Sequence, residues 1–131
     1  MQKEKKIKEY YLEIAKAVST RSPCLRENYG SVIVNNDRIV SVGYNAPATG
    51  EPHCSDCKRQ AVMHGSSYRE DCPAIHSEEN AVINAGRERC LGATLYLWGT
   101  RPAKPCYRCR RVIKNAGIVK VIINNGREVE L

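Results

Sequence analysis

The chain has 131 residues, of which 42% are apolar, 27% are charged and 6% are aromatic, with no Phe. These proportions are typical of one folded soluble domain, so we expect a single domain over residues 1–131 and exclude two separately cored domains. Lys and Arg number 21 against 14 Asp and Glu, and the net charge of +7 favours an anionic partner, either a nucleic acid or a phosphorylated small molecule.

The first half of the chain predicts a surface helix followed by a hairpin. From residue 3 to about residue 20, apolar side chains recur at steps of three and four, which predicts an amphipathic helix. Residues 31–34 and 38–45 read as two strands joined by a turn at 35–37, and we expect this hairpin at one edge of a sheet. Residues 46–73 have no sustained period, so we expect a bound metal to organise this insertion.

The second half of the chain predicts a strand–helix–strand unit. A helix over about 77–89 precedes a buried strand at 93–98. The next helix fits 106–116 and ends at Gly117 in the C′ position, and 118–123 is a second continuous apolar strand. Two strands joined by a helix imply parallel pairing. The final residues, REVEL, form a short strand or a frayed tail.

Cysteine content and hydropathy bear on the cellular compartment. No apolar run approaches the roughly 20 residues of a membrane span, and the amino terminus MQKEKKIKEY does not resemble a signal peptide. We therefore expect a cytoplasmic chain with no membrane partner. Seven cysteines in a reducing compartment indicate metal binding or catalysis rather than disulfides, and the odd number agrees with this.

Potential metal ligands lie at the starts of two predicted helices. His76 opens one helix, and Cys106 and Cys109 open the next; we expect the strands that precede these helices to be neighbours, so that the ligands converge. A helix amino terminus lowers the pKa of a thiol and favours the thiolate that metal binding requires. One imidazole and two thiolates predict a Zn²⁺ site whose fourth position is left for water, as in catalytic zinc sites.

Glu78 gives this zinc site a proton carrier. It lies two residues after His76, close enough to exchange protons with a zinc-activated water without binding the metal. The pattern H-x-E followed by P-C-x-x-C is the signature of zinc nucleobase deaminases. We therefore interpret the site as catalytic and the reaction as hydrolytic deamination, because a purely structural zinc site needs the ligands but not the glutamate.

Several segments resemble the cytidine and deoxycytidylate deaminase superfamily. CPAIHSEENAVINAGR and GATLYLWGTRPAKPCYRCRRVIKNAGIVKVII are similar to its core, and SPCLRENYGSVIV and GYNAPATGEPHC to its upstream strand and loop, so the likeness covers roughly residues 10–123. It points to the deoxycytidylate branch. The resemblance implies a cytidine-deaminase-like three-layer α/β/α fold with a mixed central sheet. It also implies attack of a zinc-activated water on C4 of a cytosine ring, most simply converting dCMP to dUMP and ammonia, with Glu78 protonating N3 and the departing ammonia.

The same resemblance implies substrate contacts. It assigns Asn45 to the sugar and the backbone around Ser77 to the ring carbonyl. Arg26, before the first strand, is our candidate for the substrate phosphate, with Arg21 as the less favoured choice. The chain departs from the family in its GYNAPATG loop, which lacks a second Gly after the Asn, and in the connection from Trp98 to Pro105, which is about four residues longer than usual.

Four further cysteines predict a second, structural zinc site, as in many relatives that the chain resembles. Two of them repeat the CxxC spacing inside the 46–73 insertion, and four thiolates would close the site. The four are Cys24, Cys54, Cys57 and Cys72. His53 and His64 are possible substitute ligands, and Cys90 is then an ordinary buried residue. The alternative is that the four are reduced thiols buried as small hydrophobes.

Other functions stay open at this point. The enzyme could act on a free base, a nucleoside, another amino-substituted heterocycle or adenosine in RNA. Its seven Tyr and one Trp do not gather into a stacking run beside a basic stripe, which disfavours a nucleic-acid partner. A non-catalytic zinc module used for assembly is the alternative outside enzymes. An exposed apolar edge leads us to expect a homo-oligomer.

Overall fold

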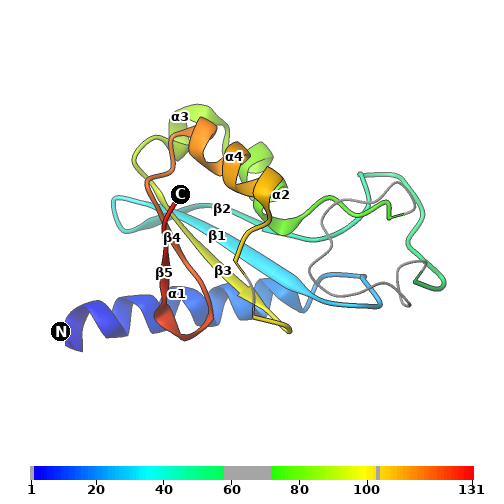
Figure 1. Ribbon diagram of the computed structural model, residues 1–131, viewed down its shortest axis with the longest axis horizontal. Coiled ribbons are helices and arrows are strands. Elements are labelled where there is room, and N and C mark those ends of the chain that lie inside the picture. Colours follow the sequence, from blue (N-terminus) through cyan, green and yellow to red (C-terminus); the bar gives the residue numbers. More distant parts are fainter. Residues whose placement is uncertain (1, 58–71, 103) are drawn as a thin grey trace.

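The computed structural model describes residues 2–57, 72–102 and 104–131. Helices cover both faces of a five-stranded mixed sheet (Figure 1). In chain order the elements are α1 (Gln2–Ser19), β1 (Tyr29–Asn35), β2 (Arg38–Tyr44), α2 (Ser77–Ala85), α3 (Arg87–Cys90), β3 (Thr94–Gly99), α4 (Tyr107–Ala116), β4 (Lys120–Ile122), the 3-10 turn η1 (Asn124–Gly126) and β5 (Glu128–Val129). Within the described ranges, no helix combines the length and the apolar character needed to cross a membrane.

The sheet has the strand order β2-β1-β3-β4-β5. β3 and β4 pair in parallel, and the other neighbouring strands pair antiparallel. The predicted hairpin at a sheet edge is confirmed, because β2 is an edge strand paired with β1. The parallel pairing predicted from the strand–helix–strand unit is also confirmed. β5 closes the other edge as a short strand.

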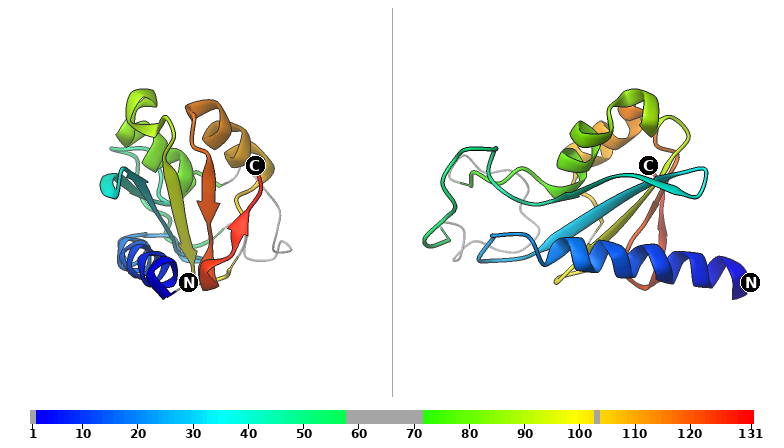
Figure 2. Two further views of the ribbon diagram at one scale, coloured as in Figure 1. Left: turned by 90° about the vertical axis from the view of Figure 1, so that its left-hand side faces the viewer. Right: turned by 180° about the vertical axis from the view of Figure 1, so that it is seen from behind.

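Three layers result from the alternation of side chains along the strands. α1 packs on one face of the sheet, and α2, α3 and α4 lie over the other (Figures 1 and 2). Buried side chains that face α2 and α4 include Ile33, Leu95 and Val121. Their neighbours in sequence face α1, and these include Val32, Tyr96 and Ile122. This period of two fixes which face each strand residue covers, and the α/β/α expectation is confirmed.

Two glycines allow the helices to approach the sheet closely. A Cβ atom added at Gly43 on β2 would lie 2.7 Å from the carbonyl oxygen of Ser77 and closer still to the backbone nitrogen of Ala81. A Cβ atom at Gly30 on β1 would lie 2.6 Å from the backbone nitrogen of Ser19. Gly43 therefore fixes the distance of α2 from the sheet, and Gly30 fixes that of α1.

The helix predicted over 77–89 is divided in two. Gly86 follows Ala85 with φ 79° and ψ 157°. Glycine adopts such a positive φ readily, and other residues do not. The chain therefore leaves α2 there and begins the short helix α3 at Arg87. The other predicted helix end is confirmed, because Gly117 has φ 95° and its N–H caps α4.

The convergence of α2 and α4 does not depend on adjacent strands. We expected the strands before these helices to be neighbours, but β1 lies between β2 and β3. The expectation is wrong because β1 and β2 form a hairpin, and it is β1 that pairs with β3. α2 and α4 nevertheless pack against each other on one face of the sheet, and both begin at the same end of the molecule (Figure 1).

Candidate active site

The three predicted zinc ligands come together at the starts of α2 and α4. His76 and Cys106 are the N-cap residues of the two helices, and Cys109 lies in the first turn of α4. Nδ1 of His76 lies 3.5 Å from Sγ of Cys106 and 3.3 Å from Sγ of Cys109. All three ligand atoms lie within 4.8 Å of one another. We call these residues the zinc cluster.

The spacing and chemistry of the zinc cluster fit Zn²⁺. With Zn–N of about 2.05 Å and Zn–S of about 2.3 Å, tetrahedral geometry places a nitrogen and a sulfur ligand about 3.6 Å apart. The two nitrogen–sulfur distances of 3.5 Å and 3.3 Å agree with this value. Imidazole and thiolate donors also suit zinc better than magnesium or calcium. The described part of the chain therefore contains a donor set that can hold one zinc ion and leave a position for water.

The two thiols of the zinc cluster differ in acidity. The thiol of Cys109 donates to the sulfur of Cys106, and this bond, with help from His76, lowers the pKa of Cys106 to about 4. The backbone N–H of Cys109 also points to Sγ of Cys106, at 3.4 Å. The same thiol–thiol bond, together with burial, raises the pKa of Cys109. One thiolate is thus preformed, and a metal ion would replace the proton held by the other.

Glu78 lies on the first turn of α2, beside the zinc cluster. Its side chain is only 5% exposed, and this burial raises its pKa. Oε1 of Glu78 accepts a hydrogen bond of 3.0 Å from Oγ of Ser77. Oγ of Ser77 lies 2.8 Å from Oγ of Ser31 on β1. The carboxyl group is therefore held at a defined place by the fold, and burial favours a state in which it keeps a proton.

A cavity of about 160 Å³ opens beside Glu78. Its lining includes every residue that we assigned to catalysis or substrate contact, together with two of the zinc ligands. These are Arg26, Asn45, His76, Ser77, Glu78 and Cys106. The less favoured Arg21 instead stands over the ring of Tyr44, at 5.7 Å from its centroid. The structure thus brings the candidate residues to one wall, and their contacts with substrate stay predictions.

Asn45 holds part of the cavity wall in place. Its side chain is 6% exposed. Oδ1 of Asn45 accepts from the backbone N–H of Tyr29 at 2.8 Å, and Nδ2 donates to the carbonyl oxygen of Glu27 at 2.9 Å. Both ends of the amide therefore bind the 27–29 segment, and that segment also lines the cavity.

Four polar residues of the cavity wall were missed by sequence reasoning. They are Glu27, Tyr29, Arg101 and Lys104. The hydroxyl of Tyr29 donates to Oε2 of Glu27 at 3.1 Å, and Nε of Arg101 lies 3.9 Å from Oε1 of the same carboxylate. Burial, followed by the charge of Glu27, raises the pKa of Tyr29. Arg101 and Lys104 belong to the long Trp98–Pro105 connection. The unusual length of that connection was the feature of the sequence that could have indicated additional residues in the cavity wall.

The four cysteines predicted for a second zinc line an adjoining cavity of about 40 Å³. Burial raises the pKa of Cys54, and the other three thiols add to this effect. Among the described residues, the zinc cluster is the group whose ligand atoms lie close enough together to hold a metal ion. A second zinc held by the four cysteines therefore stays a prediction. The substitute ligand His53 is exposed, and His64 lies outside the described residues. Cys90 is fully buried, as expected.

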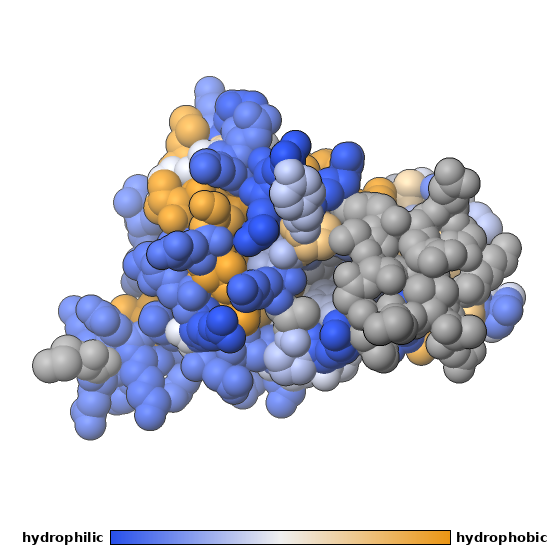
Figure 3. Space-filling model, viewed as in Figure 1, coloured by the Kyte–Doolittle hydropathy of each residue, from blue (hydrophilic) through white to orange (hydrophobic). Residues whose placement is uncertain are grey.

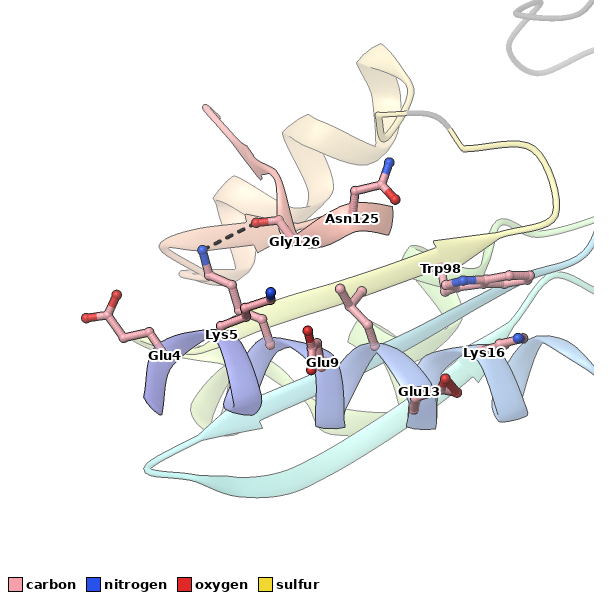
Figure 4. A pocket seen from close by; sticks show the side chains of 10 residues that line it. Glu4, Lys5, Glu9, Glu13, Lys16, Trp98, Asn125 and Gly126 are labelled. Carbon is pink, nitrogen blue, oxygen red and sulfur yellow. Dashed lines mark hydrogen bonds between the residues drawn. The ribbon is translucent and has the colours of Figure 1, made fainter. Parts of the chain in front are cut away.

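A wider groove of about 630 Å³ lies along α1, on the other side of the sheet (Figure 4). Both acidic and basic side chains line it, and Trp98 forms part of its wall. Nζ of Lys8 donates to the carbonyl oxygen of Gly126 at 3.3 Å. It shares no lining residue with the cavity beside Glu78. The groove is therefore not part of the candidate active site.

Fold and site together define a zinc-dependent deaminase. Residues 5–125 match the family model described as the cytidine and deoxycytidylate deaminase zinc-binding region. The chain belongs to this family and is a hydrolase, which confirms the family and the enzyme class predicted from the sequence.

Individual relatives agree with this assignment. The chain is 40% identical over 120 residues to the deoxycytidylate deaminase of Mycobacterium phage D29, covering 87% of this chain and 91% of that protein. It is 29% identical over 124 residues to the deoxycytidylate deaminase of Schizosaccharomyces pombe, covering 92% of this chain but 38% of that protein. Among solved structures, the dCMP deaminase from the cyanophage S-TIM5 in complex with dCMP and dUMP matches with a TM-score of 0.71 and 28% identity, over 90% of this chain and 80% of that chain.

Proposed function

We propose that residues 1–131 act as one domain that deaminates dCMP to dUMP and ammonia. The observation that carries this proposal is the composition of the cavity. It joins the zinc cluster and a buried glutamate to three cationic side chains, which we call the cationic wall: Arg26, Arg101 and Lys104. A neutral base next to the zinc cluster and a phosphate dianion next to the cationic wall would satisfy both ends of the cavity. The 40% identity to a phage deoxycytidylate deaminase supports the same substrate.

The proposed reaction forms a C4–O bond and breaks the C4–N bond of the cytosine ring. When bound, zinc lowers the pKa of a water molecule, which can then act as a nucleophile at neutral pH. The carboxylate of Glu78 accepts one proton of this water and passes it to ring N3. It then accepts the second proton, from the new hydroxyl on C4, and passes it to the departing amine, so that both protons of the water are used. Burial raises the pKa of Glu78, so the carboxyl can hold the proton between these steps.

Other residues of the cavity would orient the nucleotide. Ser77 occupies the first position of α2, where backbone N–H groups lack intrahelical acceptors and can bind the ring carbonyl. We assign the sugar to Asn45, whose amide is already fixed by the 27–29 segment. We assign the phosphate to Arg26, with Arg101 and Lys104 as the remaining cations of the wall.

A substrate screen tests the proposed function. Ammonia release is measured with dCMP, deoxycytidine, dCTP, cytosine and a guanine-type base, on protein whose zinc content has been determined. We expect dCMP to give the highest kcat/KM. If dCMP and deoxycytidine are used equally, or neither is used, the deoxycytidylate assignment is wrong. Turnover of another heterocycle would then support the second candidate function, deamination of that compound. The long connection would explain this specificity, because its residues Arg101 and Lys104 line the cavity.

We further propose a homo-oligomer. Large apolar side chains are exposed on the helix layer and before β4, including Ile83 at 69%, Tyr107 at 62% and Val119 at 67%. Figure 3 shows apolar side chains gathered on the surface around β4 and β5, whereas hydrophilic side chains cover α1. Burial of such side chains between copies would stabilise an assembly. Light scattering during size-exclusion chromatography gives the mass, and a monomer at micromolar concentration would contradict the proposal.

The proposed compartment is the cytoplasm, and the proposed partners include no nucleic acid or membrane. All seven cysteines are free thiols, as a reducing environment requires. Two zinc ions per chain complete the proposal: one in the zinc cluster and one held by Cys24, Cys54, Cys57 and Cys72.

A further inference from the structure

Two buried serine hydroxyls connect the central sheet to Glu78. The side chains of Ser31 on β1 and Ser77 on α2 are both fully buried. Ser77 donates to Oε1 of Glu78 at 3.0 Å, and the oxygens of the two serines are 2.8 Å apart. A hydroxyl carries one hydrogen. When Glu78 is ionised its oxygens can only accept, so Ser77 donates to Oε1 and Ser31 donates to Ser77.

Ser31, the first residue of this hydrogen-bond chain, is held rigidly in the sheet. Ser31 is paired on both sides within the sheet, with Gly43 on β2 and with Leu97 on β3. Gly43 also lets α2 rest against the backbone of β2, which brings Ser77 within reach. A hydroxyl in the middle of a buried strand is costly unless it is bonded. Its bond here leads through Ser77 to Glu78, the carboxyl group beside the zinc cluster.

We propose that Ser31 and Ser77 are positioning residues that fix Oε1 of Glu78 as a permanent acceptor, so that Oε2 is the oxygen that carries protons during deamination. This inference rests on the proposed function and assigns separate tasks to the two oxygens. A hydrogen bond to a charged oxygen in a buried network is stronger than one between neutral groups, and each bond polarises the next. Ser31 therefore acts on Glu78 through Ser77, without touching substrate.

Alanine variants of both serines test the proposal. We expect Ser77→Ala to lower kcat for dCMP about 10- to 100-fold, as loss of a hydrogen bond to a charged group does. Ser31→Ala should lower kcat about 3- to 10-fold, as loss of a neutral hydrogen bond does. KM and zinc content should stay near wild type for both. The double variant should be no slower than Ser77→Ala, because Ser31 acts only through Ser77. Ser31→Cys, with a weaker donor of similar size, should fall between wild type and Ser31→Ala.

Ser41→Ala is the matched control. Ser41 on β2 also binds α2, donating to the carbonyl oxygen of Ala81 at 2.7 Å, but this bond does not involve Glu78. Its loss should lower the unfolding temperature and leave kcat unchanged. The proposal is overturned if Ser31→Ala behaves like Ser41→Ala, or if the effects of Ser31→Ala and Ser77→Ala on kcat multiply independently.

A readout without substrate separates this inference from the proposed function. If wild-type protein releases no ammonia from dCMP, the proposed function fails, and the hydrogen-bond chain is then judged by thermal unfolding alone. Coupled residues should lose less stability together than the sum of the single variants. Additive changes in unfolding temperature would show that the two hydroxyls act separately, which overturns the inference.

Discussion

The candidate active site depends on a carboxyl and a thiol whose pKa values move in opposite directions. Burial raises the pKa of Glu78, whereas a hydrogen bond from Cys109 lowers the pKa of Cys106 to about 4. The raised pKa favours the protonated carboxyl group, and the lowered pKa of the thiol prepares it to bind a metal. Two groups that lie at adjacent helix starts thus receive separate tasks from their surroundings.

Removal of the charge at Glu78 tests its role as proton carrier. Glu78→Gln keeps the size of the side chain and can still accept from Ser77, so we expect zinc content and folding to be retained. Turnover of dCMP should fall by at least about 10²- to 10⁴-fold, because general acid–base transfer is lost in several steps. Metal analysis and kinetics on the same preparation provide the measurement. Normal turnover by this variant would exclude the mechanism and favour a non-catalytic zinc module.

The pKa of Cys106 can be tested by alkylation of zinc-free protein. At pH 6 an ordinary thiol, with a pKa near 9, is protonated, whereas Cys106, with a pKa of about 4, is a thiolate. We expect iodoacetamide to modify Cys106 first at pH 6, and zinc to protect it. The thiolate should be lost only as the pH falls through about 4. The fully buried Cys90 is the control. Equal labelling of the other half-exposed cysteines at pH 6, measured by peptide mass spectrometry, would contradict this.

The phosphate contact is tested by Arg26→Ala. A charge-assisted bidentate contact contributes roughly 1.5 to 3 kcal/mol, so KM for dCMP should rise about 10- to 150-fold. KM for deoxycytidine should change little, because the nucleoside has no phosphate. Arg21→Ala is the matched control, since Arg21 stands over Tyr44. If both variants affect both substrates equally, Arg26 does not bind the phosphate.

At the scale of single elements, the seating of α2 on β2 decides where the site residues lie. Gly43→Ala places a methyl group against the backbone of α2 at Ser77 and Ala81. We expect a loss of stability of about 1 to 3 kcal/mol from overpacking, together with loss of zinc affinity and kcat, because α2 also carries His76 and Glu78.

Gly30→Ala is the matched control for this prediction. It makes the same kind of backbone clash with α1, which carries no residue of the zinc cluster. It should lower stability by a similar amount and leave zinc affinity unchanged. Chemical denaturation and zinc titration measure both variants. If Gly43→Ala and Gly30→Ala lose zinc affinity equally, the packing of α2 on β2 is not what positions the zinc ligands.

The elements with strong local signals were predictable from the sequence. Apolar periodicity identified α1 and β3, and the turn residues identified the β1–β2 hairpin. His76, Glu78, Cys106 and Cys109 were found because the H-x-E and P-C-x-x-C spacings are local. The break at Gly86 was missed because helix-forming residues flank it, and its positive φ is set by how the chain returns to the sheet.

Residues that meet only through the fold were not predictable. Ser31 and Ser77 are 46 positions apart and bond because Gly43 admits α2 to the sheet. Tyr29 and Arg101 are 72 positions apart, and they meet across the ends of β1 and β3. A lone serine in the apolar run SVIV was the signal available for Ser31. It marks a polar group that needs a buried partner, but it does not say which one.

At the scale of the whole molecule, the unpatterned 46–73 segment must be tied to the rest of the fold. Its described ends lie against the loop after α1, because Cys24, Cys54, Cys57 and Cys72 line one cavity. Ordering such a segment costs about 1 to 2 kcal/mol per residue in backbone entropy, and a metal cross-link would offset part of that cost. The second zinc would therefore act on stability and on the shape of the cavity wall, since Cys24, Cys57 and Cys72 also line the cavity beside Glu78.

We expect two zinc ions per chain, with separable roles. Cys106→Ala should abolish turnover, because it removes a ligand next to the reacting atoms. Cys57→Ala should lower the unfolding temperature and make the 46–73 segment more sensitive to protease, with a smaller loss of kcat. Cys90→Ala, which removes a buried thiol outside both sets, is the control and should leave two zinc ions bound. Metal analysis by mass spectrometry decides the number. A single zinc ion in wild type that survives Cys57→Ala and disappears in Cys106→Ala would mean that Cys24, Cys54, Cys57 and Cys72 hold no metal and are reduced, half-buried thiols.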